Sequence, residues 1–417
     1  MIRFIHTADL HLDTPFRGLT RCNSGLAARL KQAADQSFRN IIDLCISREA
    51  DFLVISGDTF DSENQSLSAQ LKFAEGMRKL NTCRIPAYII CGNHDPQGTW
   101  LNSLDLPENC IIFGSSEVQR TVFQKNDEDA AEIHGISYRL SRVEENLSGK
   151  FSPAGSLPSV ALLHGTIGAP GAHRNYAPFG IEDVQPLGFD YWALGHIHKP
   201  QAVRKEDPAI VYPGNPQGRD FGEPGARGCC LVELEKGSRP EIEWIPCAPI
   251  RFENLTIEMS PADDLGCIEE RITHAEEEWR KESGQSGTIL RIELTGRTRL
   301  HRQLNRAGEM DEFIRDRNQG QLDREDFRWI DRVEVRTRPE LDMDSVASGS
   351  GFIAELMRMV CEYENDPGRA DKLITALSRE MSPAVFQKIK DFSSAEKQEI
   401  LSRAKWMLLD HLREEEE

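Results

Sequence analysis

The stretch Phe52-Leu53-Val54-Ile55-Ser56-Gly57-Asp58-Thr59-Phe60-Asp61 joins a short apolar run to a turn that carries two carboxylates. A run this short and this rich in branched side chains is typical of a buried strand covered on both faces. In an open α/β sheet, ligands bind in the crevice beyond the carboxyl ends of such strands. The stretch therefore predicts a layered α/β fold with polar ligands at one edge of a sheet.

The same pattern recurs over residues 1–250. Further apolar runs that end in polar clusters are Ile2–Ile5, Ala87–Cys91, Val160–Leu163 and Tyr191–Leu194. Between the first two strands, apolar residues from Leu26 to Cys45 recur near a period of 3.6, and a second helix is expected at about Ser66–Leu80. Strands that alternate with helices indicate a sheet layered with helices.

The pattern changes after residue 250. Phe252–Ile257 and Thr288–Leu294 alternate apolar and polar residues, with a helix expected near Leu265–Glu282 and a strand near Val333–Arg336. This predicts a small α+β domain over 251–340. The Ser-, Gly- and Asp-rich stretch that follows predicts a linker over 341–352.

Residues 353–417 are expected to be helical. Ile353, Leu356, Met357 and Val360 have helical spacing, Pro367-Gly368 follow that helix, and Ser393–Glu396 resembles a capping box. The apolar stripes favour a small closed bundle, and the alternative is an amphipathic helix that docks on a partner.

Composition narrows the class of protein. A chain of 417 residues predicts two or three domains, and 39% hydrophobic with 28% charged residues is ordinary for a globular protein.

The sequence contains no apolar run long enough to span a membrane and starts without a secretory signal, so we expect a cytoplasmic protein with no membrane partner. Ten cysteines without C-x-x-C spacing predict reduced, mostly buried thiols. A net charge of −18 predicts weak DNA binding by this chain alone.

Five polar clusters stand in order, each just past a predicted strand: Asp9-Leu10-His11, Gly57–Asp61, Gly92-Asn93-His94-Asp95, His164-Gly165 and Gly195-His196-Ile197-His198. Residues two apart in an extended chain face the same way, so the first and last residues of a D-x-H or H-x-H triplet can converge. Imidazole nitrogens with carboxylate and amide oxygens suit Mn²⁺, Fe²⁺ or Zn²⁺. Any one cluster alone is more often a surface or structural feature, but five in order indicate a metal-dependent enzyme.

These clusters resemble the calcineurin-like metallophosphoesterase superfamily, which has a four-layer α/β/β/α sandwich. Three stretches are closer still to the SbcD family of DNA repair exonucleases, in its YhaO-like bacterial branch: Ala8–Asp13, Tyr191–His198 and Tyr212-Pro213-Gly214-Asn215-Pro216-Gln217-Gly218-Arg219. The strong resemblance covers about residues 1–250. Residues 251–340 resemble the small capping domain of that family in architecture only.

The resemblance implies two divalent metal ions, with Mn²⁺ expected. Asp9, His11 and His198 would hold one, Asn93, His164 and His196 the other, and Asp58 would bridge them. A bridging carboxylate keeps two cations about 3.5–4 Å apart around an activated water.

The resemblance also gives His94 a role other than metal binding. It would steady the scissile phosphate or protonate the leaving oxygen, and Asp95 would orient it. Archaeal and eukaryotic relatives often place a histidine where this chain has Asp61, and we expect Asp61 to hydrogen-bond a ligand instead.

The predicted function is a metal-dependent DNA exonuclease or endonuclease in repair. Arg297, Arg299 and Arg302 could contact DNA, although a solvated face balanced by acids is an equal alternative. The resemblance implies an SbcC-type coiled-coil ATPase as partner and leaves a homodimer open. Two alternatives stand: a phosphodiesterase or pyrophosphatase acting on small nucleotides, and a scaffold for an ATPase with a dormant site.

Overall fold

The structure is a computed structural model. It describes residues 1–14, 23–61, 66–98, 104–168, 176–284, 286–340, 348–364 and 366–378, with 392–393, 396–397, 400–401 and 404–405. These form two compact units: Met1–Met259 with Asp263–Gly296 and Gln303–Arg336, and Ser260–Ala262 with Arg297–Arg302 and Thr337–Glu417.

The first sheet has the order β12-β11-β1-β2-β3-β4. Its strands are β1 (Ile2–Thr7), β2 (Phe52–Ser56), β3 (Ala87–Ile90), β4 (Cys110–Ile112), β11 (Gly228–Leu234) and β12 (Glu241–Pro246). Strands β1 to β4 are parallel to their neighbours, and β11 runs antiparallel to β1. The predicted strands Ile2–Ile5, Phe52–Ile55 and Ala87–Cys91 are confirmed as β1, β2 and β3, with boundaries shifted by one or two residues, whereas β4 and β12 were not predicted from the sequence.

The second sheet has the order β5-β6-β7-β8-β10-β9. It consists of β5 (Gln119–Lys125), β6 (Glu128–Ile136), β7 (Ser159–His164), β8 (Tyr191–Gly195), β9 (Gln201–Arg204) and β10 (Ala209–Tyr212). Strands β6, β7, β8 and β10 are parallel. Strands β5, β6 and β9 were not predicted from the sequence.

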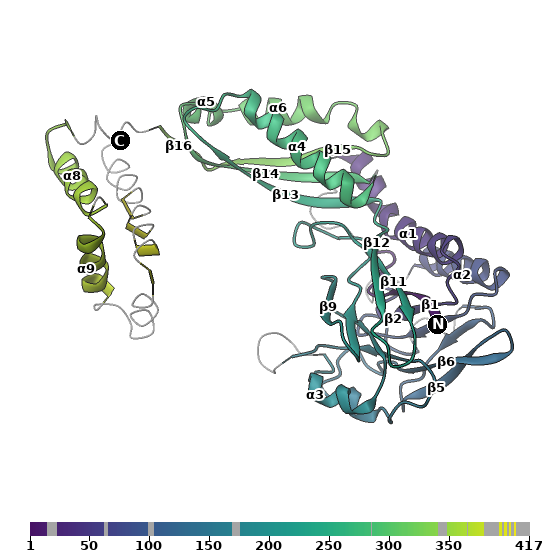
Figure 1. The fold of residues 1–417 in the computed structure, drawn as a ribbon. Coiled ribbons are helices and arrows are strands. Elements are labelled where there is room, and N and C mark those ends of the chain that lie inside the picture. The colour runs from purple at the N-terminus through teal and green to yellow at the C-terminus, as the bar shows by residue number, and fades with distance from the viewer. Residues whose placement is uncertain are drawn as a thin grey trace. The chain divides into compact units, whose positions relative to one another are not determined.

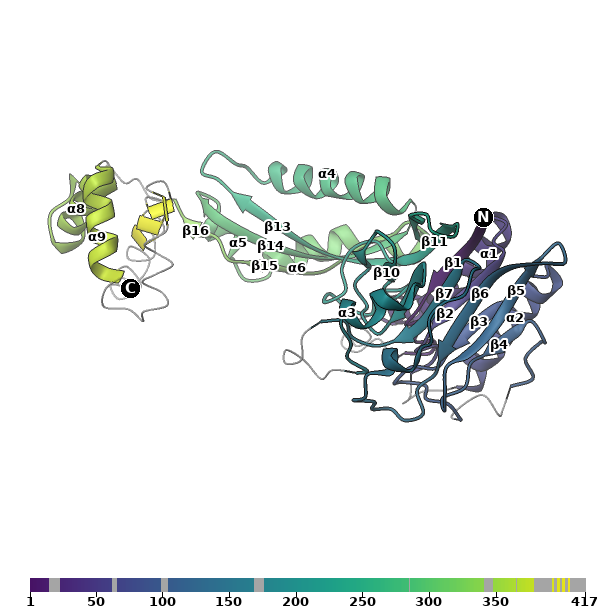
Figure 2. The same ribbon diagram turned by 60° about the horizontal axis from the view of Figure 1, so that its bottom comes forward.

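The two sheets pack face to face between helical layers (Figures 1 and 2). Phe52 and Val54 of β2 point into the core between the sheets, while Leu53 and Ile55 pack against α1 (Ser24–Ser47) and α2 (Leu67–Thr82). The outer face of the second sheet is covered by α3 (Ile181–Val184) and the 3-10 turns Leu147–Lys150 and Gln185–Leu187. The predicted four-layer sandwich is confirmed, and burial on both faces explains why its strands read as continuous apolar runs.

A third sheet contains β13 (Ile250–Met259), β14 (Gly287–Thr298) and β15 (Arg328–Val335), all parallel, and the two-residue β16 (Arg338–Pro339) pairs with β14. Helices α4 (Gly266–Ser283) and α6 (Glu309–Asn318) lie over one face of it (Figure 1), with α5 (His301–Leu304) and a 3-10 turn at Gln321–Asp323 in the connections. Only one helix was expected here. Helix α6 was missed because its apolar residues Met310, Phe313 and Ile314 span little more than one turn and none of its residues is buried.

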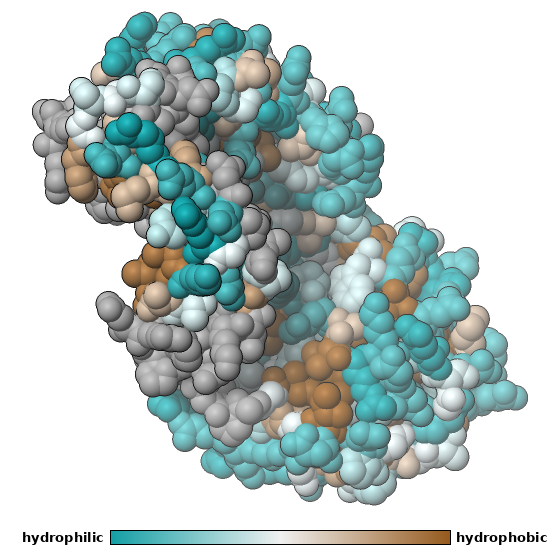
Figure 3. Space-filling view, turned by 60° about the vertical axis from the view of Figure 1, so that its left-hand side comes forward, coloured by the Kyte–Doolittle hydropathy of each residue, from teal (hydrophilic) through white to brown (hydrophobic). Residues whose placement is uncertain are grey.

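The C-terminal part contains α8 (Phe352–Glu364) and α9 (Pro367–Ser378). Pro367-Gly368 follow α8 as expected, but Pro367 also begins α9, in the first-turn position where a missing backbone N–H costs nothing. Most of the predicted linker, 341–347, lies outside the described residues. The face drawn in Figure 3 is largely hydrophilic with separate hydrophobic patches. No helix among the described residues has the length and apolarity needed to cross a bilayer.

Candidate metal centre

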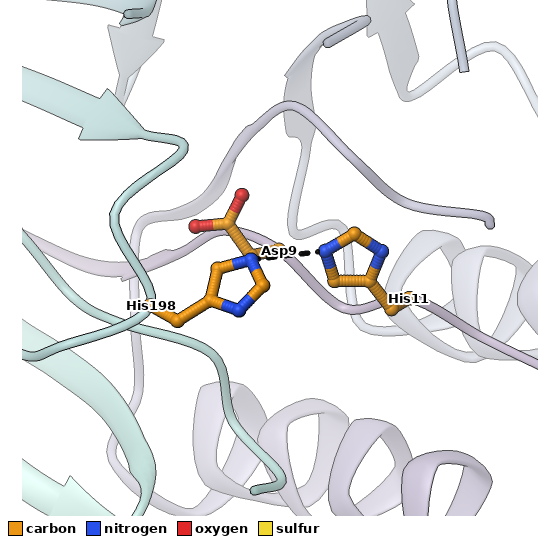
Figure 4. A group of neighbouring side chains, drawn as sticks. All are labelled: Asp9, His11 and His198. Atoms are coloured by element: carbon orange, nitrogen blue, oxygen red, sulfur yellow. Dashed lines mark hydrogen bonds between the residues drawn. The ribbon is translucent and has the colours of Figure 1, made fainter. Parts of the chain in front are cut away.

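The seven predicted metal ligands lie together where β1, β2, β3, β7 and β8 end. On one side, Nε2 of His11 lies 3.2 Å from Nε2 of His198, and Asp9 lies beside both rings (Figure 4). These three residues offer ligand atoms that lie within 4.8 Å of one another.

The other side is built around an amide oxygen. Oδ1 of Asn93 lies 2.9 Å from Nε2 of His164 and 3.1 Å from Nδ1 of His196. Oδ2 of Asp58 lies 3.4 Å from Nε2 of His164 and 3.9 Å from Nε2 of His11. Asp58 therefore stands between the two groups, in the place of a bridging carboxylate.

The backbone is strained at the ligands. Asp9, His11, Asp58 and His196 have φ angles of 53°, 44°, 51° and 96°. Side chains other than glycine rarely adopt positive φ, and such strain persists only where surrounding structure imposes it. The chain is thus held in turns that aim these side chains inward, a property that no sequence pattern displayed.

Two glycines allow the strands to approach closely enough. A Cβ at Gly92 would collide with Oδ1 of Asp58, and one at Gly195 would collide with the carbonyl oxygen of Ser56. The lack of a side chain at these two glycines therefore permits the close approach.

Burial and charge favour a cation at this point. Asp9 and Asp58 are each 1% exposed, so both carboxylates are almost fully withdrawn from water. Burial raises the pKa of Asp9, whereas the imidazoles of His164 and His11 outweigh burial and hold the pKa of Asp58 well below its usual range. Burial lowers the pKa of His11 and brings that of His196 to about 3, which leaves those rings neutral with lone pairs to donate. Burial lowers the pKa of His164 as well, but the charge of Asp58 outweighs it and raises that pKa to about 9. The neutral imidazoles of His11 and His196 beside buried carboxylates fit transition-metal binding.

His94 lies at the edge of this cluster and is 36% exposed at its side chain, against 2% for His11. Its backbone N–H donates to Oδ1 of Asp58 at 2.8 Å, and its ring packs edge-on against that of His11 with centroids 4.8 Å apart. Its side chain is therefore more open to a substrate than those of His11, His164 and His198, which are 2%, 0% and 20% exposed.

The prediction that Asp95 orients His94 is wrong. Oδ2 of Asp95 accepts the backbone N–H groups of Thr59 and Phe60, and Oδ1 accepts that of Gly92. Burial is the main cause that raises the pKa of Asp95, to about 7. Asp95 ties the loop after β2 to the loop after β3. The carboxylate beside His94 is Asp61, with Oδ1 3.6 Å from Nδ1.

Two residues of the site were not predicted from the sequence. Oε1 of Glu223 lies 2.7 Å from Nδ1 of His198, and Arg219 pairs with the same carboxylate oxygen at 3.0 Å. In the sequence, Arg219 was noted only as the last residue of the stretch Tyr212–Arg219, which resembles the SbcD family. The available signal was the spacing of four between a basic and an acidic residue in a glycine-rich turn just past β10.

The predicted DNA contacts lie in the other compact unit. Arg299 and Arg302 are exposed, and Arg297 donates to the carbonyl oxygen of Pro339 at 3.2 Å. Burial, then the charges of Arg338 and Arg302, lower the pKa of His301 nearby. Within the described ranges, no acidic side chain forms an ion pair with Arg299 or Arg302.

Comparison with known proteins gives matches along most of the chain. The family model "Calcineurin-like phosphoesterase" matches residues 2–200, and "Metallophosphoesterase YhaO, middle domain" matches residues 252–338. The metallophosphoesterase YhaO of Bacillus subtilis (strain 168) is 31% identical over 413 residues, which cover 99% of this chain and 98% of that relative. The crystal structure of TT1561 of Thermus thermophilus is 12% identical with a TM-score of 0.34, over 58% of this chain and 98% of that one.

Proposed function

The chain belongs to the calcineurin-like phosphoesterase family, and on that premise we propose that it is a Mn²⁺-dependent DNA nuclease that hydrolyses phosphodiester bonds in DNA repair. The observation that carries the proposal is the convergence of seven ligand side chains, with His94 beside them and more open to solvent than His11. Two divalent cations held by these residues would supply an activated water and neutralise the phosphate.

The protein's own side chains account for the remaining chemistry. Asp58 lies between the two groups of ligands and can hold both cations at once. Since Nδ1 of His94 is turned toward Asp61, Nε2 is the atom that can donate a proton to the leaving oxygen. The carboxylate of Asp61 is the main cause that raises the pKa of His94, so His94 holds this proton to higher pH than it would without Asp61.

DNA as the substrate is supported by the exposed arginines at the end of β14 and in α5. Guanidinium groups bind phosphate oxygens well, and contacts to phosphates give affinity that does not depend on sequence. The net charge of −18 favours a second candidate, a phosphodiesterase acting on small nucleotides, which would need no DNA surface.

One assay separates the two candidates. Full-length protein, first measured for bound metal, is given Mn²⁺ with linear duplex DNA, single-stranded DNA or bis-p-nitrophenyl phosphate. We expect all three substrates to be cleaved, and His94→Ala to retain its metal while losing about 10²- to 10⁴-fold in rate. Cleavage of the small ester alone would favour the nucleotide phosphodiesterase.

We propose further that the C-terminal helices bind a coiled-coil ATPase of the SbcC type. Phe352 and Met359 of α8 and Leu377 of α9 are 72%, 51% and 55% exposed, so large apolar side chains remain uncovered among the described residues. Such an ATPase would also supply DNA-binding charge. A pull-down with the full chain and with a version ending at Ser350 tests this, and equal recovery of the ATPase would contradict it.

A further inference from the structure

His198 is held from both sides of its ring. Nε2 faces Nε2 of His11 at 3.2 Å, where a cation would bind, and Nδ1 lies 2.7 Å from Oε1 of Glu223. An imidazole that binds a metal through Nε2 must carry its proton on Nδ1. A carboxylate that accepts this proton fixes both the tautomer and the direction of the ring.

Glu223 is itself firmly placed. Its side chain is 15% exposed, and its Oε2 accepts from Nδ2 of Asn215 at 2.7 Å and from the backbone N–H of Arg219 at 2.9 Å. Nη2 of Arg219 donates to Oε1 at 3.0 Å and also lies 3.0 Å from Nδ1 of His198, so the shorter contact of that ring nitrogen, at 2.7 Å, is the one with Glu223. Although burial raises it, His198 and Arg219 together hold the pKa of Glu223 well below its usual range. The carboxylate is therefore ionised, with every partner it needs to stay in one orientation.

The loop that carries Glu223 is clamped to the third sheet. The ring of Phe221 packs edge-on against Phe252 of β13 with centroids 5.2 Å apart, and the guanidinium of Arg291 lies 3.8 Å from its centre. The backbone N–H of Gly225 donates to the carbonyl oxygen of Phe252, and Asn254 donates to that of Phe221. All of these residues lie in one compact unit.

The other ligands are held differently. Nδ1 of His164 lies 2.9 Å from the backbone carbonyl oxygen of Ser56, and Nδ1 of His11 is buried with no hydrogen-bond partner in the part of the chain that the structure describes. Nδ1 of His164 also lies 4.0 Å from Oδ1 of Asp9, which is itself one of the seven ligands. Among these three imidazoles, that of His198 is the one whose Nδ1 lies within hydrogen-bond distance of a carboxylate outside the seven ligands.

We infer that Glu223 is a positioning residue that prepares His198 for metal binding, so that the cation held by Asp9, His11 and His198 depends on it and the cation held by Asn93, His164 and His196 does not. This inference rests on the proposed metal centre. Glu223 would contact neither the cation nor the substrate and would act only by orienting His198.

The test is a titration of the full, metal-stripped chain with Mn²⁺, in which calorimetry measures the binding. We expect Glu223→Gln to weaken one class of site by about 10- to 100-fold and to leave the other unchanged. Glu223→Asp keeps the charge but withdraws the carboxylate by one methylene, so it should weaken the same class of site. Asp220→Asn removes one charge from the same loop, where Asp220 is exposed and caps Gly222, and should change neither class.

A second readout needs no metal. In wild-type protein labelled with ¹⁵N-histidine and kept in EDTA, the resonances of neutral His198, identified with His198→Gln, should show the proton on Nδ1. A proton on Nε2 would overturn the inference. So would unchanged Mn²⁺ affinities in both Glu223 variants, including the case where Tm in EDTA falls, since that pattern belongs to a purely structural residue.

These outcomes are separate from failure of the proposed nuclease. A wild-type protein that binds Mn²⁺ and fails to cleave DNA would refute the nuclease while leaving Glu223 positioned as inferred. Conversely, active protein with Glu223-independent metal binding would refute only the inference.

Discussion

Oδ1 of Asp61 lies 3.6 Å from Nδ1 of His94, and Oδ2 of the same carboxylate accepts the hydroxyl of Thr14 at 3.0 Å. Asp61 is thereby held with one oxygen toward the exposed histidine of the site. Position 61 of this chain thus places a carboxylate beside the ring of His94.

The first prediction concerns pH. Asp61 is the largest cause that raises the pKa of His94, so His94 stays protonated to higher pH when Asp61 is present. If protonated His94 is the general acid, activity falls as pH rises through this pKa. Asp61→Asn should therefore move the alkaline limb of kcat/KM on bis-p-nitrophenyl phosphate to lower pH, at saturating Mn²⁺. An alkaline limb at the wild-type position would exclude this role for Asp61.

The second prediction concerns Gly92. A methyl group there would collide with Asp58 and lie 2.8 Å from Cε1 of His164, so Gly92→Ala should displace ligands of both cations. We expect Mn²⁺ affinity to fall at least about 10-fold, measured by metal content after gel filtration. Gly149→Ala is the matched control, since nothing lies within 4 Å of its added Cβ. Equal metal content in the two variants would contradict the collision.

The central strands could be predicted from sequence because each is buried on both faces, which makes a short apolar run unambiguous in its context. The hairpin of β5 and β6 could not. Its outer strand is mostly exposed and reads as polar, and its turn depends on positive φ at Asn126 and Asp127. Local pattern carries little information where one face of a strand is solvated and the turn lacks glycine.

The residues of the candidate site likewise fall into those that the sequence could predict and those that it could not. The motifs and the resemblance they carry selected seven side chains, and the structure brings these seven together at one edge of the sheets. The partners of His94 and His198 could not be predicted from the sequence, because Asp61 and Glu223 contact these histidines only in the folded chain. Adjacency in sequence pointed to Asp95 as the partner of His94, and the fold uses that carboxylate to join two loops instead.

The third prediction concerns the positive surface. Arg297, Arg299 and Arg302 lie at the end of β14 and the start of α5, and reversing their charge to Glu should weaken DNA binding without regard to sequence. Each lost phosphate contact should lower the slope of log affinity against log salt by about 1. Fluorescence anisotropy at several salt concentrations measures both quantities. Arg142→Glu, an exposed arginine paired with Glu144, is the control. A slope that matches wild type would remove these arginines from the DNA surface.

The fourth prediction tests whether the third sheet stabilises the metal centre through Phe221. Phe221→Ala removes the ring between Phe252 and Arg291, which frees the loop that carries Glu223 while leaving every ligand in place. The Mn²⁺ affinity of the site that contains His198 should then fall, by less than in Glu223→Gln, because the carboxylate remains but is less restrained. Leu322→Ala is matched to it: Leu322 packs partly buried in the same hydrophobic cluster, and its carbonyl oxygen bonds Arg29 in α1. Both variants should lower Tm, since both remove apolar contacts, but only Phe221→Ala should weaken metal binding. Were Leu322→Ala to weaken it equally, the effect would come from general loosening of the third sheet, and the specific path through Phe221 to His198 would be refuted.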